Sequence, residues 1–179
     1  MEHDNSPQQS RYPIVDTNIL IYTGSKQEAL ATAAITFLDE QASHGYRLAI
    51  SEFTTYEYLK RLWGKKAEKA EEAISTYERK AVTREVLETA SILDGLYYDE
   101  GLTNISDGDK IIAATAILED GLILTANHKD FPNPFFITHE WRVLPIKNPR
   151  YTQHLYLALY KPNTQLINLK VSDKEKSFA

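Results

Sequence analysis

Three short apolar runs, separated by stretches with helical spacing, constrain the fold of this chain more than any other feature. The runs are Ile14-Val15, Leu48–Ile50 and Leu122–Leu124. Runs of this length, bounded by polar residues, are typical of buried strands. Because strands that alternate with helices favour a parallel sheet covered by helices, the sequence predicts an α/β fold. Either Phe135–Ile137 or Val143-Leu144 is expected to add an edge strand.

Helices are predicted between these strands from the spacing of apolar residues and from capping residues. Gln27–Ser43 has apolar residues at helical spacing, Ser51 suits the N-cap of a second helix, and a third helix follows Thr83. The stretch SDGDKIIAATAILEDG is apolar on nearly every face of a helix that begins at Ser106 or Asp107. Such a helix is expected to be buried, and its alanines permit close packing against a sheet.

The chain of 179 residues, of which 42% are hydrophobic, suits one compact domain. We expect a flexible polar arm at residues 1–11, a domain at residues 12–149, and a C-terminal extension, disordered in part, at residues 150–179. Residues 65–82 are rich in Lys, Glu and Ala, which favours a solvated helix or helical hairpin at the periphery.

Composition restricts the chemistry that this chain can carry out. It contains no cysteine, so neither disulfides nor thiolate metal sites are available, and any metal must be bound by oxygen or imidazole ligands. Its net charge of −5 argues against binding nucleic acid by bulk charge but permits a local basic patch. No apolar run approaches the roughly 18 residues of a membrane span, so we expect a soluble protein without membrane contact. The absence of cysteine favours the cytoplasm.

Polar residues interrupt the stretch IVDTNILIY directly after the first predicted strand. Asp16 at this point is costly to bury unless its charge is compensated, so either a turn separates two elements or Asp16 binds a cation. Ligands of an open parallel α/β sheet bind beyond the carboxyl ends of its strands. Acids that converge there would repel one another unless divalent cations were bound, and an oxygen-only cluster suits Mg²⁺ or Mn²⁺. The other polar residues expected at this edge are Glu57, Asp109, Asn127 and Asp130.

Taken singly, each acid also has a simpler explanation. Asp109 would be stabilised by the positive end of its helix dipole, by about 0.3–1 kcal/mol. Asp130 suits the cap of a turn before Phe131-Pro132, and Glu57 lies beside an apolar stripe of its helix. Residue type alone therefore does not distinguish a metal site from ordinary surface acids.

Three successive segments place these acids in a common context: VDTNILIY, SEFTTYEYLKRL and DKIIAATAILEDGLILTANHKDF. In this order they resemble the signatures of PIN-domain ribonucleases, in particular toxins of the VapC kind, over roughly residues 12–145. The resemblance implies a three-layer α/β/α fold with a short central parallel sheet flanked by helices. It also implies an acidic triad and a fourth ligand that together hold metal. These ligands would be Asp16, Glu57, Asp109 and either Asn127 or Asp130.

The activity that the resemblance implies is hydrolysis of RNA phosphodiester bonds by an endoribonuclease with one or two Mg²⁺ or Mn²⁺ ions. Such ions orient and activate water and stabilise the leaving oxygen. Thr17, Asn18 and Thr125 would orient the ligands. The implied partners are RNA, a small antitoxin protein and a second copy of this chain in a homodimer. The catalytic carboxylates would be Asp16, Glu57, Asp109 and Asp130.

Basic residues near the acids would carry RNA across this negatively charged edge. The same side chains could equally serve to keep surface helices soluble, so their sequence positions alone are weak support for a binding role. The candidates are Lys60, Arg61, Lys65, Lys110 and Lys129.

Other functions fit the sequence less well. A phosphatase of the haloacid dehalogenase type would need a second acid at the position of Asn18, and a nucleotide-binding fold would need a glycine-rich phosphate loop, which this chain lacks. A flap-type DNA nuclease would need long insertions for threading DNA. The main alternative is a catalytically silent PIN domain that binds RNA or protein.

Overall fold

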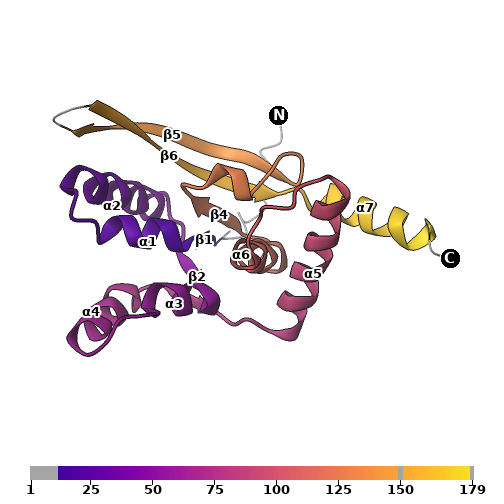
Figure 1. Cartoon of the computed structure of the whole chain (residues 1–179), viewed down its shortest axis with the longest axis horizontal. Coiled ribbons are helices and arrows are strands. Elements are labelled where there is room, and N and C mark those ends of the chain that lie inside the picture. The colour runs from indigo at the N-terminus through magenta and orange to yellow at the C-terminus, as the bar shows by residue number, and fades with distance from the viewer. Residues whose placement is uncertain (1–11, 149–150, 178–179) are drawn as a thin grey trace, which may run out of the picture.

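The structure is a computed structural model that describes residues 12–148 and 151–177, so the arm predicted at residues 1–11 lies outside the described residues. A mixed sheet forms its centre, and helices pack on both faces (Figure 1). Among the described residues, no helix has the length and apolar character that a membrane crossing requires. The elements are β1 (Pro13–Val15), α1 (Thr17–Thr23), α2 (Glu28–Ser43), β2 (Ala49–Ser51), α3 (Glu52–Leu59), α4 (Lys65–Ile74), β3 (Glu78–Lys80), α5 (Arg84–Asp99), α6 (Asp107–Leu118), β4 (Leu122–Thr125), the 3₁₀ turn η1 (His128–Asp130), β5 (Phe136–Asn148), β6 (Tyr151–Pro162) and α7 (Thr164–Ser177).

The strand order of the sheet is β3-β2-β1-β4-β6-β5. β1 is parallel to β2 and to β4, and β2 is parallel to β3, whereas β6 is antiparallel to both β4 and β5. Ile14 in β1 lies opposite Ala49 in β2 and Ile123 in β4. These three strands therefore end at the same edge of the sheet. The predicted α/β fold with a parallel core is confirmed.

The break in IVDTNILIY is a direct change from strand to helix. Val15 ends β1, and Asp16, with extended backbone (φ −72°, ψ 150°), is the N-cap of α1. The Asp16 carboxylate accepts a hydrogen bond from the backbone amide of Asn18 (3.4 Å). A cap of this kind stabilises a helix by roughly 0.5–2 kcal/mol. The polar residues inside this apolar stretch thus begin a helix.

The other helix starts expected from capping residues are confirmed. In each case the N-cap hydroxyl accepts a hydrogen bond from the amide of the second or third helical residue, at 3.2–3.3 Å. For α6, where either Ser106 or Asp107 could begin the helix, the N-cap is Ser106. The capping residues are Ser51 for α3, Thr83 for α5 and Ser106 for α6.

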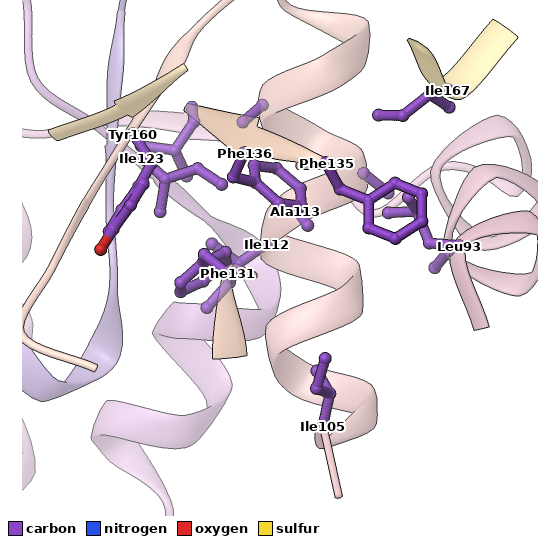
Figure 2. Packing of buried hydrophobic residues seen from close by; sticks show 14 of the residues in the cluster. Leu93, Ile105, Ile112, Ala113, Ile123, Phe131, Phe135, Phe136, Tyr160 and Ile167 are labelled. Atoms are coloured by element: carbon purple, nitrogen blue, oxygen red, sulfur yellow. The ribbon is translucent and has the colours of Figure 1, made fainter. Parts of the chain in front are cut away.

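The apolar helix α6 is buried against the sheet, as its sequence predicts. Ala113, Ala114 and Ala116 have no exposed surface, which allows the helix to approach the strands closely. Figure 2 shows Ile112 and Ala113 of this helix packed near the phenylalanine rings that follow β4, Phe131 among them. α5, α6 and α7 cover this face of the sheet, and α1 and α2 cover the other. The three-layer α/β/α arrangement is confirmed.

Residues 65–82 form more than the peripheral helix or hairpin expected from their composition. α4 buries Ile74, and β3 then joins the sheet as an edge strand parallel to β2. All three residues of β3 are charged, so no apolar run marks the strand. Lys80 at its end forms ion pairs with Glu78 (2.8 Å) and Glu119 (2.6 Å). Charged side chains are tolerated on an edge strand because they can reach solvent or such partners.

The C-terminal part of the chain differs most from expectation. Phe135–Ile137 and Val143-Leu144 were predicted as alternative short edge strands, but β5 is one strand of 13 residues that includes Phe136, Ile137 and both members of the second pair. Within the extension expected to be disordered in part, residues 151–177 supply β6, which lies between β4 and β5, and the helix α7. Ile167 of α7 is buried in the core. Exposed and buried residues alternate from His154 to Leu157 in β6, as is typical of a strand.

Candidate active site

Asp16 is buried, with 3% of its surface exposed, at the carboxyl end of β1. Thr125 Oγ1 donates a hydrogen bond to Asp16 Oδ2 (2.6 Å), and the side-chain amide of Asn18 donates another to the same oxygen. Burial raises the pKa of Asp16 and the negative charge of Glu57 adds to the rise, whereas the hydrogen bonds oppose it. Asp16 is thus a buried carboxyl group that donors hold in one orientation beside a second acid.

Asn18 and Thr125 tie the start of α1 to the end of β4 around this carboxyl group. Asn18 Nδ2 donates to Thr125 Oγ1 (3.1 Å), and Asn18 Oδ1 accepts from the backbone amide of Ala126 (3.0 Å). Thr125 Oγ1 also accepts from the backbone amide of Asn127 (2.9 Å). The two side chains therefore hold Asp16 and fix the ends of two adjacent strands relative to each other.

Glu57 lies on α3, partly buried, next to the first turn of α1. Thr17 Oγ1 donates a hydrogen bond to Glu57 Oε2 (2.7 Å). Lys60 Nζ lies 3.3 Å from the other oxygen, Glu57 Oε1. Because Thr17 directly follows Asp16, this hydrogen bond holds the second acid beside the first.

Asp109 lies in the first turn of α6. Burial raises the pKa of Asp109 to about 7, and the negative charges of Asp130 and Asp16 add to the rise against the opposing hydrogen bond from Ser106. The Ser106 hydroxyl donates that bond to Asp109 Oδ2 at 2.5 Å. Asp130, in the 3₁₀ turn after β4, accepts a hydrogen bond from the side-chain amide of Asn127. The raised pKa of Asp109 therefore reflects the nearby charges of Asp130 and Asp16 as well as burial.

Four acids from separate segments thus lie within electrostatic reach at the edge where β1, β2 and β4 end. Mutual repulsion among carboxylates is the condition that a bound divalent cation relieves, and their oxygens suit Mg²⁺ or Mn²⁺. Within residues 12–148 and 151–177, however, no three histidine, aspartate or glutamate side chains are arranged so that they could hold a metal ion. The oxygen atoms and the negative charge of these acids fit a divalent ion. In the described residues, however, the carboxylates do not converge on a single position for an ion. The four acids are Asp16, Glu57, Asp109 and Asp130.

Comparison with known proteins supplies a family for this geometry. The family model of the PIN domain matches residues 14–134. The chain belongs to the PIN-domain family. Of solved structures, a chain of a toxin–antitoxin complex from Klebsiella pneumoniae is similar to it, with a TM-score of 0.51 and 26% identity, covering 68% of this chain and 92% of that one. A chain of VapBC2 from Rickettsia felis, bound to a DNA fragment from the promoter, gives a TM-score of 0.55 and 24% identity, covering 67% and 90%.

The PIN-domain family and the likeness to toxin–antitoxin complexes confirm the resemblance found in the sequence. No curated protein shows a significant match to this chain. The part matched by the PIN family model contains all four acids and ends before β5. The hairpin of β5 and β6 and the helix α7 therefore lie outside the matched part.

The basic residues predicted beside the acids of this PIN domain have different environments. Lys110 does not suit contact with a substrate, because its side chain is largely buried and lies 2.5 Å from Asp94 and 3.1 Å from Asp107. It ties α6 to α5 instead, so its prediction as an RNA-binding residue is not supported by its position. The remaining candidates are exposed: Lys60, Arg61, Lys65 and Lys129.

Two further residues of the PIN domain lie at this site without having been singled out as functional from the sequence. Ser106 was recognised only as a helix cap, but its hydroxyl also contacts the Asp109 carboxylate. Tyr97 on α5 is buried, and its hydroxyl has no hydrogen-bond partner among the described residues. Burial raises the pKa of Tyr97, and the charges of Asp109 and Asp130 add to the rise. The helical spacing of Tyr97 marks it only as a core residue.

Proposed function

We propose that this PIN domain is a metal-dependent endoribonuclease, the toxin of a toxin–antitoxin pair. The observation that carries the proposal is the meeting of four acids at one edge of the sheet, close enough that Asp16 and Asp130 help to raise the pKa of Asp109 to about 7. Natural proteins seldom retain mutually repelling acids without a compensating cation or a functional role. Hydrolysis of a phosphodiester assisted by metal accounts for both the acids and their position.

In this proposal one or two Mg²⁺ or Mn²⁺ ions supply Lewis acidity and an oriented water molecule when bound. The ligands would be Asp16, Glu57, Asp109 and either Asp130 or Asn127. The chain's other polar side chains hold these ligands in position. Thr125 and Asn18 orient Asp16, Thr17 orients Glu57, and Ser106 orients Asp109.

The partners in this proposal follow from the acid site and from the similar proteins. Exposed basic residues would contact the RNA phosphates on either side of the cleaved bond. The similar Klebsiella pneumoniae structure is a toxin–antitoxin complex, which supports a small antitoxin as the protein partner. A homodimer and a cytoplasmic location are further parts of the proposal. The candidate RNA contacts are Lys60, Arg61, Lys65 and Lys129.

The decisive experiment compares RNA cleavage by wild type, Asp16→Asn and Asp107→Asn. Asp16→Asn should lower the cleavage rate at least about 100-fold while the circular dichroism spectrum stays unchanged, since electrostatic and metal effects in active sites have this size. Asp107→Asn is the matched control, because Asp107 lies on the same helix turn as Asp109 with its side chain almost fully exposed. EDTA should stop cleavage, and Mg²⁺ or Mn²⁺ should restore it. Undiminished cleavage by Asp16→Asn would remove this residue from the mechanism.

One observation favours a second candidate function, a catalytically silent PIN domain that binds RNA or protein. It is the open arrangement of acids in the described part of the chain, in which no three are placed to hold a metal ion. Calorimetric titration with Mn²⁺ separates the two functions. Mn²⁺ binding that disappears in Asp16→Asn supports the nuclease, whereas RNA binding without either Mn²⁺ binding or cleavage supports the silent module.

A further inference from the structure

The β5–β6 hairpin extends past the end of the parallel sheet. β4 pairs with β6 only from Ile123 to Thr125, and Thr125 lies opposite Ala158. β6 begins seven residues earlier, at Tyr151, and stays paired with β5 over that length. The hairpin therefore continues beyond the carboxyl end of β4, the edge that holds Asp16 (Figure 1). It also follows residue 134, where the family match ends, so it is an addition to the matched PIN domain.

The two faces of this hairpin differ in what covers them. On one face Leu144, Leu155 and Leu157 pack into the cluster of α1 and α2. On the other face Trp141 and Tyr156 are 63% and 47% exposed. Contiguous exposed apolar surface, unlike single exposed side chains, marks binding sites.

Trp141 and Tyr156 are neighbours on that second face. Trp141 lies opposite Ala158 and Tyr156 opposite Val143 in the ladder between β5 and β6. Because side chains two residues apart on a strand share a face, Tyr156 is the diagonal cross-strand neighbour of Trp141, within reach of aromatic rings. Ala158 is buried between them, and both aromatic side chains keep exposed surface.

His128 connects this pair to the acid site. Its ring and the Tyr156 ring are nearly perpendicular (87°) with centroids 5.7 Å apart, and its Nδ1 lies 2.8 Å from the hydroxyl of Tyr160. Asn127 precedes His128 and Asp130 ends the same 3₁₀ turn. We call Trp141, Tyr156 and His128 the aromatic face. It is continuous with the edge at which the acids lie.

The charge of the hairpin suits a polyanion. Residues 135–162 contain four lysine or arginine residues and one acid, a net charge of +3, whereas the whole chain has −5 and the remainder therefore −8. The segment is therefore less repulsive to phosphates than the rest of the chain. Arg142 in this segment is paired with Glu40 (2.9 Å) and Glu140 (3.4 Å). The charged residues of the segment are Arg142, Lys147, Arg150, Lys161 and Glu140.

We propose that the aromatic face is a binding site for single-stranded RNA, whose unpaired bases stack on Tyr156 and Trp141 as the strand leaves the acid site. The proposal rests on the proposed nuclease function and adds a substrate-binding surface outside the part matched by the PIN family model. Single-stranded RNA presents its base faces to aromatic side chains, and a duplex does not. The hairpin therefore selects single strands or loops over helical RNA.

The test measures binding in the cleavage-deficient Asp16→Asn protein, full length, by fluorescence anisotropy with a labelled oligouridylate. Introducing both Trp141→Ala and Tyr156→Ala should weaken binding at least about five- to 150-fold, the effect of losing one stacked base. The double replacement by Phe keeps aromatic rings and should retain near wild-type affinity. Leu169→Ala is the control for loss of exposed apolar surface, since Leu169 is 57% exposed on α7, at the opposite end of the molecule from the hairpin tip (Figure 1). A blunt RNA duplex should bind Asp16→Asn equally well with and without the two alanine substitutions.

Three other outcomes would each contradict a different part of the two proposals. Equal oligouridylate affinity of Asp16→Asn with and without the two alanine substitutions, with unchanged circular dichroism, overturns the stacking site but leaves the nuclease proposal intact. Absence of cleavage by wild type, with the loss of affinity still seen on alanine substitution, overturns the nuclease and retains the binding site. A change of molecular mass in light scattering on alanine substitution, with RNA affinity unchanged, would show that the aromatic face joins two copies of the chain.

Discussion

At the scale of single residues, the acid site combines groups that destabilise the protein in the absence of metal. Burial and the charges of Asp130 and Asp16 raise the pKa of Asp109 to about 7. Part of this cost is offset by the hydroxyl of Ser106 and by the donors around Asp16. Selection for stability alone would not place these acids together. Active sites often lower the stability of a protein in this way.

The stability of the protein in EDTA should therefore depend on pH through Asp109. Because the folded state holds the proton more tightly than the unfolded state, stability contributed by this group is present below about pH 4 and is lost as pH rises toward 7. Asp109→Asn removes the charge and should raise the free energy of unfolding at pH 8 by about 1–2 kcal/mol, after allowance for screening of a partly exposed group. At pH 4 the two proteins should be equally stable.

Thermal denaturation at pH 4 and pH 8 measures this difference, with Asp107→Asn as the exposed control on the same helix turn. If Asp109→Asn is no more stable than wild type at pH 8, then the acids are not close enough to repel one another. Addition of Mn²⁺ should raise the melting temperature of wild type and leave that of Asp109→Asn unchanged, because the lost carboxylate is a proposed ligand.

At the scale of elements, small residues set how closely helices and strands approach. Gly121 follows α6 and precedes β4, and a Cβ atom there would lie 2.6 Å from the backbone oxygen of Tyr12. That contact is with main chain and cannot be relieved by rotating a side chain. Gly95, inside α5, has space, since the nearest atom is the Nζ of Lys174 at 3.7 Å.

Alanine at these two glycines should have opposite effects. Gly121→Ala should lower the free energy of unfolding by about 1–3 kcal/mol, because β1 must move relative to the start of β4. Gly95→Ala should raise it by about 0.5–1 kcal/mol, because alanine loses less backbone entropy than glycine in a helix. Urea denaturation of both variants measures the difference. Similar free energies of unfolding for the two variants would mean that the backbone at Gly121 can shift enough to accommodate a Cβ atom.

At the scale of the whole molecule, the segment after residue 150 completes the fold. β6 fills the position between β4 and β5, and Ile167 on α7 is buried in the same cluster as α5 and α6. Ion pairs at the surface, such as Lys174 with Asp99 (2.6 Å), accompany this packing but contribute little. We therefore expect residues 151–177 to unfold together with the PIN domain.

Ile167→Ala tests whether the chain unfolds as one unit. It should lower the stability of the single transition by about 2–3 kcal/mol, or roughly 4–10 °C in melting temperature for a chain of this size. Lys174→Ala should change the stability by less than about 0.5 kcal/mol. A separate early transition in calorimetry, with the main transition unshifted by Ile167→Ala, would show that α7 is an independent extension.

The sequence by itself determined the strands that carry apolar runs, the helices that carry caps such as Ser51 and Thr83, and the positions at which acids follow strands, because these signals are local. It did not reveal β3, whose charged residues are accommodated at an edge by ion pairs with distant groups such as Glu119. Only the tertiary structure decided that Lys110 is held by Asp94, that Tyr97 lies near Asp109, and that a long hairpin extends past the acids. Burial, charge proximity and strand pairing arise between segments far apart in the chain, so no window of sequence contains them.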